Sequence, residues 1–301
     1  MKASHLRISF PIVLLVLISV LSGCTVPFGN FKYAGDKSPV TIAKSTHTTL
    51  ILDLQISVGS ITFEVDSTAS YLVNVVNKVS IREGSDDTLA EAKEVTSSEI
   101  DSDTMQISFD SQDSGLTTNY KYDLIINVSN NIELQLNLLV TTGDIDVNLQ
   151  DSTVTVSVLD VVITTGVLTF SIADVTLTDS SPTLQTTTGD QELAILNVHS
   201  TVSTLWSIFT TTGTINVDFT DNPPTSSSSL THSFTIDVTT GDIDIISDLH
   251  QDVGLKITAS VSTGTITLPG GSNSYTSSNF ASSTLKYDFS LETTTGDIKF
   301  T

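Results

Sequence analysis

The stretch Thr141-Thr142-Gly143-Asp144-Ile145 decides the fold, because close relatives of it recur through the second half of the chain. The marker glycines of these copies, spaced at intervals of 23, 23, 24, 28, 23 and 32 residues, are Gly143, Gly166, Gly189, Gly213, Gly241, Gly264 and Gly296. A nearly fixed period of this size indicates a protein built by stacking one short unit on itself.

The residues that follow each marker glycine alternate between apolar and polar. The second residue after the glycine is Ile or Leu in every copy except one, and the fourth is Val, Leu, Ile or Phe. This period-two alternation predicts a half-buried strand whose even positions point inward. Gln191 is the single polar residue at an inward position. The glycine itself fits a corner where the backbone needs a positive φ or where another backbone passes close by.

A unit of 23 residues has room for about three short strands with their turns. In the copy that begins at Gly143 we expect these strands over residues 145–149, 154–158 and 161–165. We therefore predict an all-β fold, a parallel β-solenoid of roughly 23-residue coils with an irregular N-terminal part. The two longest intervals contain the segments 222–229 and 269–274, whose Pro, Gly, Asn and Ser residues predict loops.

The N-terminus has the features of an export signal. Lys2 and Arg7 accompany a mostly apolar run over residues 8–21, and small residues follow it. The run is shorter than the about 20 residues that a membrane-spanning helix needs. Its closing residues Leu21-Ser22-Gly23-Cys24 resemble the lipobox of prokaryotic lipoproteins. That resemblance implies that Cys24 is lipidated and becomes the first mature residue.

An uncleaved N-terminal anchor helix is the alternative, and both interpretations place the rest of the chain on the outer side of a membrane. Cys24 is the only cysteine, which excludes a disulfide framework. We therefore expect a lipoprotein signal peptide over residues 1–23, a lipid-linked tether over 24–48 and a β-solenoid domain over 49–301. Within that domain we expect irregular structure to about residue 139 and regular coils over 140–301, with residues 83–103 forming a polar surface excursion.

The order of these features resembles the putative adhesin family, a domain of unknown function in bacterial and archaeal surface proteins. Its members have a leading Gly-x-Ile strand, here Gly59-Ser60-Ile61, then an irregular stretch and several glycine-marked coils. The resemblance covers about residues 49–301 and rests on Gly, Thr and alternating aliphatic residues. It implies a β-solenoid at the cell surface and brings no catalytic residues with it.

The charge of the chain restricts its partners. The net charge is −22, and removal of Lys2 and Arg7 with the signal leaves 10 basic against 34 acidic residues, hence −24. From Tyr122 to Leu255 there are 17 Asp and Glu residues and no Lys or Arg. Such a surface repels phosphate backbones, so we expect no nucleic-acid partner.

Acidic residues follow the marker glycine in alternate copies along the chain. The acidic copies contribute the candidate cation ligands Asp144, Asp146, Asp190, Glu192, Asp242 and Asp244. One interpretation is a Ca²⁺-binding strip, because hard cations prefer several carboxylate and carbonyl oxygens. The other is a solvated outer face on which Asp supports the turn after glycine. The alternation favours the second, so we expect no specific metal site and no cofactor, only loose association with divalent cations.

The catalytic candidates are few. His199, His232 and His250 fall at different distances from their marker glycines, so we expect them to be separate surface or turn residues. We expect Trp206 to be buried, not exposed for stacking on a sugar. No acid pair stands out from the repeat background. We therefore expect a non-enzyme, with a polysaccharide lyase or hydrolase on a β-helix scaffold as the alternative.

The predicted function is that of a lipid-anchored cell-surface protein with a role in adhesion, scaffolding or envelope structure. Its expected partners are the membrane, through Cys24, and a cell-surface protein or glycan. The last six residues, 296–301, begin the strand of the unit and then stop without a polar cap. A bare terminal rung, the last strand layer of a stack, exposes unpaired backbone groups, so one expectation is self-association through this C-terminal rung. The alternative is that the loop over residues 270–283 folds over it.

Overall fold

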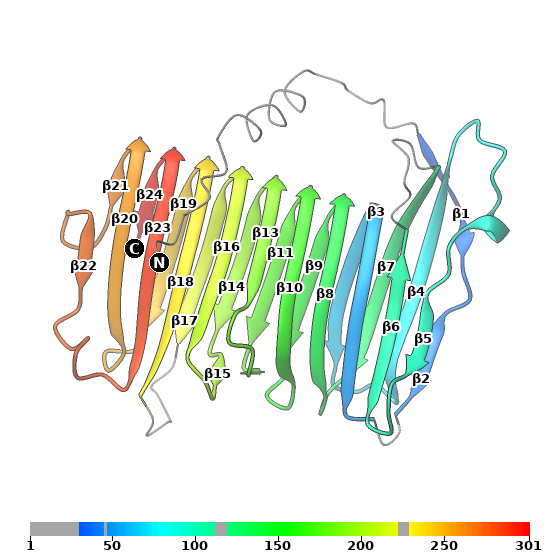
Figure 1. The fold of residues 1–301 in the computed structure, drawn as a ribbon, viewed down its shortest axis with the longest axis horizontal. Coiled ribbons are helices and arrows are strands. Elements are labelled where there is room, and N and C mark those ends of the chain that lie inside the picture. The colour runs from blue at the N-terminus through cyan, green and yellow to red at the C-terminus, as the bar shows by residue number, and fades with distance from the viewer. Residues whose placement is uncertain (1–29, 45–46, 112–118, 222–228) are drawn as a thin grey trace, which may run out of the picture.

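The computed structural model describes residues 30–44, 47–111, 119–221 and 229–301 (Figure 1). The predicted signal peptide, Cys24 and residues 222–228 of the predicted loop lie outside these residues. The described part of the chain consists of strands, their connections and one short 3-10 helix. No helix within it is long and apolar enough to cross a membrane. The all-β class predicted from the alternating pattern is confirmed.

The strands fall into an N-terminal group and a repetitive group. The N-terminal elements are β1 (Phe31–Asp36), β2 (Val40–Ala43), β3 (Thr49–Asp66), β4 (Tyr71–Arg82), η1 (Leu89–Glu91), β5 (Thr96–Glu99), β6 (Thr104–Asp110), β7 (Tyr120–Ser129) and β8 (Glu133–Thr142). The repetitive elements are β9 (Ile145–Gln150), β10 (Thr155–Thr165), β11 (Leu168–Ala173), β12 (Thr176–Leu177), β13 (Thr183–Thr188), β14 (Gln191–Leu196), β15 (His199–Ser200), β16 (Thr204–Thr212), β17 (Ile215–Asp221), β18 (Leu230–Thr240), β19 (Ile243–Leu249), β20 (Gly254–Thr263), β21 (Ile266–Thr267), β22 (Ser274–Thr276), β23 (Leu285–Thr295) and β24 (Ile298–Phe300).

Most strands stack side by side in two long parallel ladders (Figure 1). The first ladder has the order β6–β3–β8–β10–β13–β16–β18–β23–β20. The second has the order β7–β3–β9–β11–β14–β17–β19–β24–β21. Each marker glycine lies at the corner where a strand of the first ladder passes into a strand of the second. Equivalent residues of neighbouring units are in register, because Leu168 pairs with Ile145 on one side and Gln191 on the other.

The number of strands per unit differs from the expectation. The predicted second and third strands of the first regular unit are one continuous strand, β10. In the next two units the corresponding stretch is interrupted, and the short strands β12 and β15 continue only the beginning of β10. A full set of three strands is therefore not present in every unit.

The order of the rungs in space differs from their order in the chain. The last copy of the unit, β23 and β24, lies between β18 and β19 on one side and β20 and β21 on the other. Ile298 thus pairs with both Ile243 and Ile266. The expectation that residues 296–301 form a bare terminal rung is therefore wrong. The interval between the last two marker glycines is 32 residues long. This length makes the arrangement possible, because it lets the chain return past β20 and place β23 between β18 and β20.

The core consists of the inward residues of both ladders. The positions two and four residues after each marker glycine are buried in every copy except at the end of the ladder, where Ile266 is half-buried. The predicted inward direction of these positions is confirmed. Gln191 is also fully buried, and its Nε2 donates a hydrogen bond to the carbonyl oxygen of Phe209 at 2.7 Å.

Antiparallel strands cover the N-terminal end of the ladders. β4 pairs with β7, and β1 and β2 pair with β4. β5 covers β6 in the first ladder. Most of residues 31–43, which we expected within a polar tether, therefore belong to this antiparallel cap. The cap prevents the parallel ladder from continuing in this direction.

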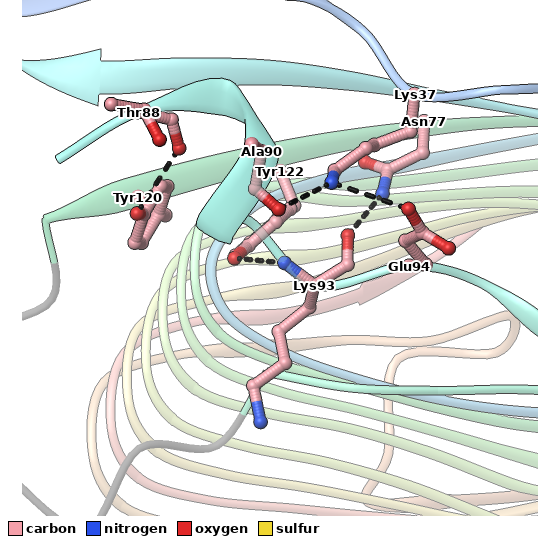
Figure 2. Close-up of polar contacts among 8 residues, drawn as sticks. All are labelled: Lys37, Asn77, Thr88, Ala90, Lys93, Glu94, Tyr120 and Tyr122. Atoms are coloured by element: carbon pink, nitrogen blue, oxygen red, sulfur yellow. Dashed lines mark hydrogen bonds and ion pairs between the residues drawn. The ribbon is translucent and has the colours of Figure 1, made fainter.

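The predicted surface excursion is fastened to the cap by polar contacts (Figure 2). The buried Lys37 donates from Nζ to the carbonyl oxygen of Ala90 at 3.2 Å and pairs with Glu94 at 3.3 Å. Asn77 donates to the carbonyl oxygen of Lys93 at 3.1 Å, and the Lys93 amide donates to the Tyr122 hydroxyl at 3.0 Å. These contacts hold residues 88–94 against β4 and β7. The excursion is therefore a structural cover for the end of the core.

Candidate functional site

The marker glycines stack directly upon one another. Gly189 has a φ of 136°, and a Cβ atom added to it would lie 1.7 Å from the carbonyl oxygen of Gly166. The ladder hydrogen bonds continue on both sides of the corner, from Gly166 N to Thr188 O and from Leu168 N to Asp190 O, each at 3.0 Å. The amide between them, that of Val167, donates to Asp144 Oδ1 at 2.8 Å. The aspartate after the glycine thus accepts a hydrogen bond from the one corner amide that makes no hydrogen bond within the backbone ladder.

This corner arrangement recurs along the second ladder. The Thr214 amide donates to Asp190 Oδ1 at 2.8 Å, and the Asp297 amide donates to Asp242 Oδ1 at 2.7 Å. The Thr265 amide and hydroxyl both donate to Asp297, and these hydrogen bonds hold the pKa of that carboxyl below its usual value. Asp therefore supports a turn, but the turn of the neighbouring rung, whereas the second interpretation of the acidic pattern placed it in the turn after its own glycine.

The second acid of each acidic unit lies in a separate row on the outer face of the second ladder. This row runs Asp146–Thr169–Glu192–Asn216–Asp244–Lys299. Asn216 Nδ2 donates to Glu192 Oε1 at 2.8 Å, and Lys299 Nζ lies 3.3 Å from Asp244 Oδ2. Neutral side chains therefore separate the acids of this row, and Lys299 pairs with the last of them.

The alternation of acidic and neutral rungs does not extend to the C-terminal end. Because the last copy is inserted beside β19, the corner residues Asp242 and Asp297 are direct neighbours. The repulsion between these carboxylates is opposed locally, because the Asp297 amide points at Asp242 and Lys299 pairs with Asp244. The chain order of the units could not reveal this contact.

The six candidate cation ligands occupy two rows. The corner row contains Asp144, Asp190 and Asp242, and the strand row contains Asp146, Glu192 and Asp244. A neutral rung separates successive acids in each row. Among the described residues, no group of three or more His, Cys, Asp or Glu side chains is arranged to hold a metal ion.

The outer face of the second ladder contains a hollow with a volume of about 380 Å³. Its polar wall includes Glu192, Asn216, Asp218 and Asp244, and the side chain of Ile246, 58% exposed, contributes an apolar surface. The hollow exists because β11 and β14 carry the short side chains of Ser171 and Ala194 where β17 and β19 carry Asp218 and Ile246. We did not predict this feature, although the fifth position after each marker glycine contains its signal.

An aromatic cluster lies in the interior between the two ladders. Trp206 is 2% exposed and stacks on Phe234 with 5.6 Å between ring centroids, so its predicted burial is confirmed. The expectation for His232 is wrong, because this residue is buried within the cluster. Its Nδ1 lies 2.8 Å from Thr204 Oγ1, and burial lowers its pKa to about 4. The sequence does contain a signal for this burial. His232 lies two residues before Phe234 on β18, so both side chains point to the same inward face.

The other two candidate histidines, and two lysines of the repeats, lie on separate elements. Lys256 on β20 pairs with Asp288 at 2.8 Å, and Lys299 on β24 pairs with Asp244. His199 is exposed on β15, and His250 accepts a hydrogen bond from the Asp252 amide in the turn after β19. The structure brings none of these four residues together with His232.

Asp190→Ala tests the contribution of the corner carboxylates to stability. It removes the acceptor of the Thr214 amide, and we expect the free energy of unfolding to fall by about 1–2 kcal/mol. Asp190→Asn is the matched control, because the amide oxygen can still accept this hydrogen bond although the charge is lost. Urea unfolding of both variants measures the difference. Equal losses would mean that the hydrogen bond is not the stabilising feature.

Neither a family model nor a curated protein matches this chain. Several solved structures resemble it at low sequence identity. A "putative cell adhesion protein" from Clostridium sporogenes has 15% identity and a TM-score of 0.40, with 90% of this chain and 99% of that one covered. A "putative adhesin" from Bacteroides fragilis has 13% identity and a TM-score of 0.30, with 88% and 98% covered. These names describe those proteins, and similarity at this level transfers no function to this chain.

Proposed function

We propose that this chain is a lipid-anchored cell-surface protein whose parallel β-solenoid of about 23-residue coils presents an acidic outer face for adhesion or scaffolding. The observation that carries the proposal is the hollow on the second ladder, whose volume of about 380 Å³ falls within the range of small-ligand sites. It is lined by carboxylates, an amide and an exposed aliphatic side chain, which suit recognition of a polar surface group. The occupant we propose is a neutral or amine-bearing glycan, or a basic segment of a surface protein.

The charge of the surface supports this choice of partner. Glu192, Asp218 and Asp244 surround the hollow, and the strands that form it carry no Lys or Arg apart from the neighbouring Lys299. An anionic polysaccharide would lie against these carboxylates, and the one neighbouring cation, Lys299, is already paired with Asp244. A neutral sugar can instead donate hydrogen bonds from its hydroxyl groups to the carboxylates and to the side-chain oxygen of Asn216. The proposed role is therefore binding, with no reaction step assigned to these residues.

A binding screen tests the proposed function. The mature chain, with Cys24→Ser, is applied to an array of neutral, amino and acidic glycans and to purified surface proteins. Ala194→Trp fills the hollow, and Thr235→Trp places the same bulk on the exposed face of the other ladder. We expect neutral or amino ligands to bind the parent, and Ala194→Trp but not Thr235→Trp to weaken binding by at least about tenfold. Equal effects of the two substitutions, or turnover of a glycan, would contradict the proposal.

The proposed lipid anchor needs a separate test, because Cys24 lies outside the described residues. We expect the native protein to fractionate with membranes and to incorporate a labelled fatty acid. Cys24→Ser should remove the label and release the protein if the signal is cleaved. Membrane retention of a native protein that incorporates no label would instead indicate an uncleaved anchor helix.

A further inference from the structure

The end of the ladders formed by β20, β21 and β22 leaves part of a strand edge open (Figure 1). β22 pairs with residues 256–258 of β20, and the Ala259 amide donates to Asn273 O at 2.9 Å. Among the described residues, no strand pairs with the outer side of residues 260–267. The other end of both ladders is covered by the antiparallel strands β4 and β5. An open edge with unpaired N–H and C=O groups is a template for a further strand.

This edge also differs chemically from the rest of the protein. The chain has a net charge of −22, yet no charged residue occurs from Ile257 to Leu285, a segment that includes the open edge and the loop beside it. Exposed edges in natural proteins usually carry Lys, Pro or an inward charge that prevents pairing. Residues 260–263 are instead Ser, Val, Ser and Thr, of which Val and Thr favour strands. The outermost rung itself therefore adds no like charge between two copies, and the nearest acids, Glu292 and Asp297, lie one rung further in.

We propose that two copies of this chain associate through this end, with residues 260–263 of one copy pairing with the same residues of the other. Identical strands related by a two-fold axis run antiparallel, so the pairing closes after two copies. The half-buried side chains of Val261 and Ile266 lie at this end and lose exposed apolar surface in the dimer. The antiparallel cap at the far end limits further growth. The first ladders of the two copies then form one continuous sheet.

Mass measurement tests the dimer. The full chain with Cys24→Ser, which cannot be lipidated, is examined by light scattering and sedimentation over a range of concentrations. We expect a dimer that dissociates on dilution. Ser262→Lys with Thr263→Lys places two charges on the edge of each copy, and we expect dimerisation to weaken by at least about tenfold.

A matched variant separates the edge from the general effect of added charge. Thr239→Lys with Thr240→Lys changes the equivalent exposed positions of β18, because Thr240 and Thr263 both pair with Thr295 of β23. This variant should remain dimeric. A monomeric parent at about 100 µM, growth into open polymers, or the same response of both lysine variants would overturn the proposal.

Cross-linking keeps the proposal testable if the lysine variants fold poorly. Cys24 is the only cysteine, so Ser262→Cys in the Cys24→Ser background introduces a single thiol at the edge. We expect mild oxidation to give disulfide-linked dimers of Ser262→Cys and not of Thr239→Cys. Failure of Ser262→Cys to cross-link more than Thr239→Cys would overturn the proposed pairing.

Discussion

Gly189→Ala is expected to cause the largest loss of stability of any single substitution considered for this protein. The new Cβ atom would lie 1.7 Å from the carbonyl oxygen of Gly166 and 2.7 Å from its carbonyl carbon. The φ of 136° at this position is also strained for a residue with a side chain. Relief of the contact requires two rungs to separate, which weakens ladder hydrogen bonds on both sides of the corner. We expect the free energy of unfolding to fall by more than about 4 kcal/mol.

Gly270→Ala is the matched control for this substitution. Gly270 also has a positive φ, 84°, but an added Cβ atom would meet no other atom within 4 Å. It therefore tests the conformational strain alone, which we expect to cost about 1 kcal/mol. Urea unfolding followed by circular dichroism compares the two variants with the parent. Similar losses in both would show that the stacking of the glycines is not what makes the corner intolerant.

The second large effect concerns pH and the buried His232. Burial in the aromatic cluster lowers its pKa from 6.5 to about 4, so the folded protein disfavours the protonated form. Between these two values the unfolded chain binds a proton that the folded chain does not. Protonation of His232 therefore does not affect the free energy of unfolding above about pH 6.5, and it lowers this free energy as the pH falls towards 4. The shift corresponds to about 3 kcal/mol of unfolding free energy at pH 4.

Thr204→Val with His232→Leu isolates this contribution. The double variant removes both members of the Thr204–His232 hydrogen bond, so that neither buried group is left without its partner. Tyr287, whose ring centroid lies 5.5 Å from that of His232, and its acceptor Asp221 are unchanged. We expect the stability of the variant relative to the parent to rise by about 3 kcal/mol between pH 7 and pH 4. A difference that stays constant over this range would contradict the buried, neutral histidine.

The local sequence pattern was sufficient to predict which side chains of the repeats point into the core. A glycine that recurs with Thr before it and alternating aliphatic residues after it predicts a corner followed by a half-buried strand. The inward position of Ile145, the burial of Gln191 and Trp206, and the turn-supporting role of Asp190 all agree with that pattern. The inward directions depend only on the few residues nearest in sequence, whereas the hydrogen bond of Asp190 is made to the Thr214 amide of the next rung and needed the tertiary structure.

The order and the ends of the ladders depended on the tertiary structure. The units beginning at Gly264 and Gly296 have nearly the same strand pattern, so either could pair with β19, and only the path of the intervening segment places β24 there. The same placement brings Asp297 beside Asp242 and leaves the open edge on β20 in place of the chain terminus. The hollow near Ala194 likewise needs the side chains of neighbouring rungs together. Local residue patterns were enough to define the repeating unit and its buried face. Which of several similar strand edges pair with one another depends on the path of the whole chain, so only the complete fold defines it.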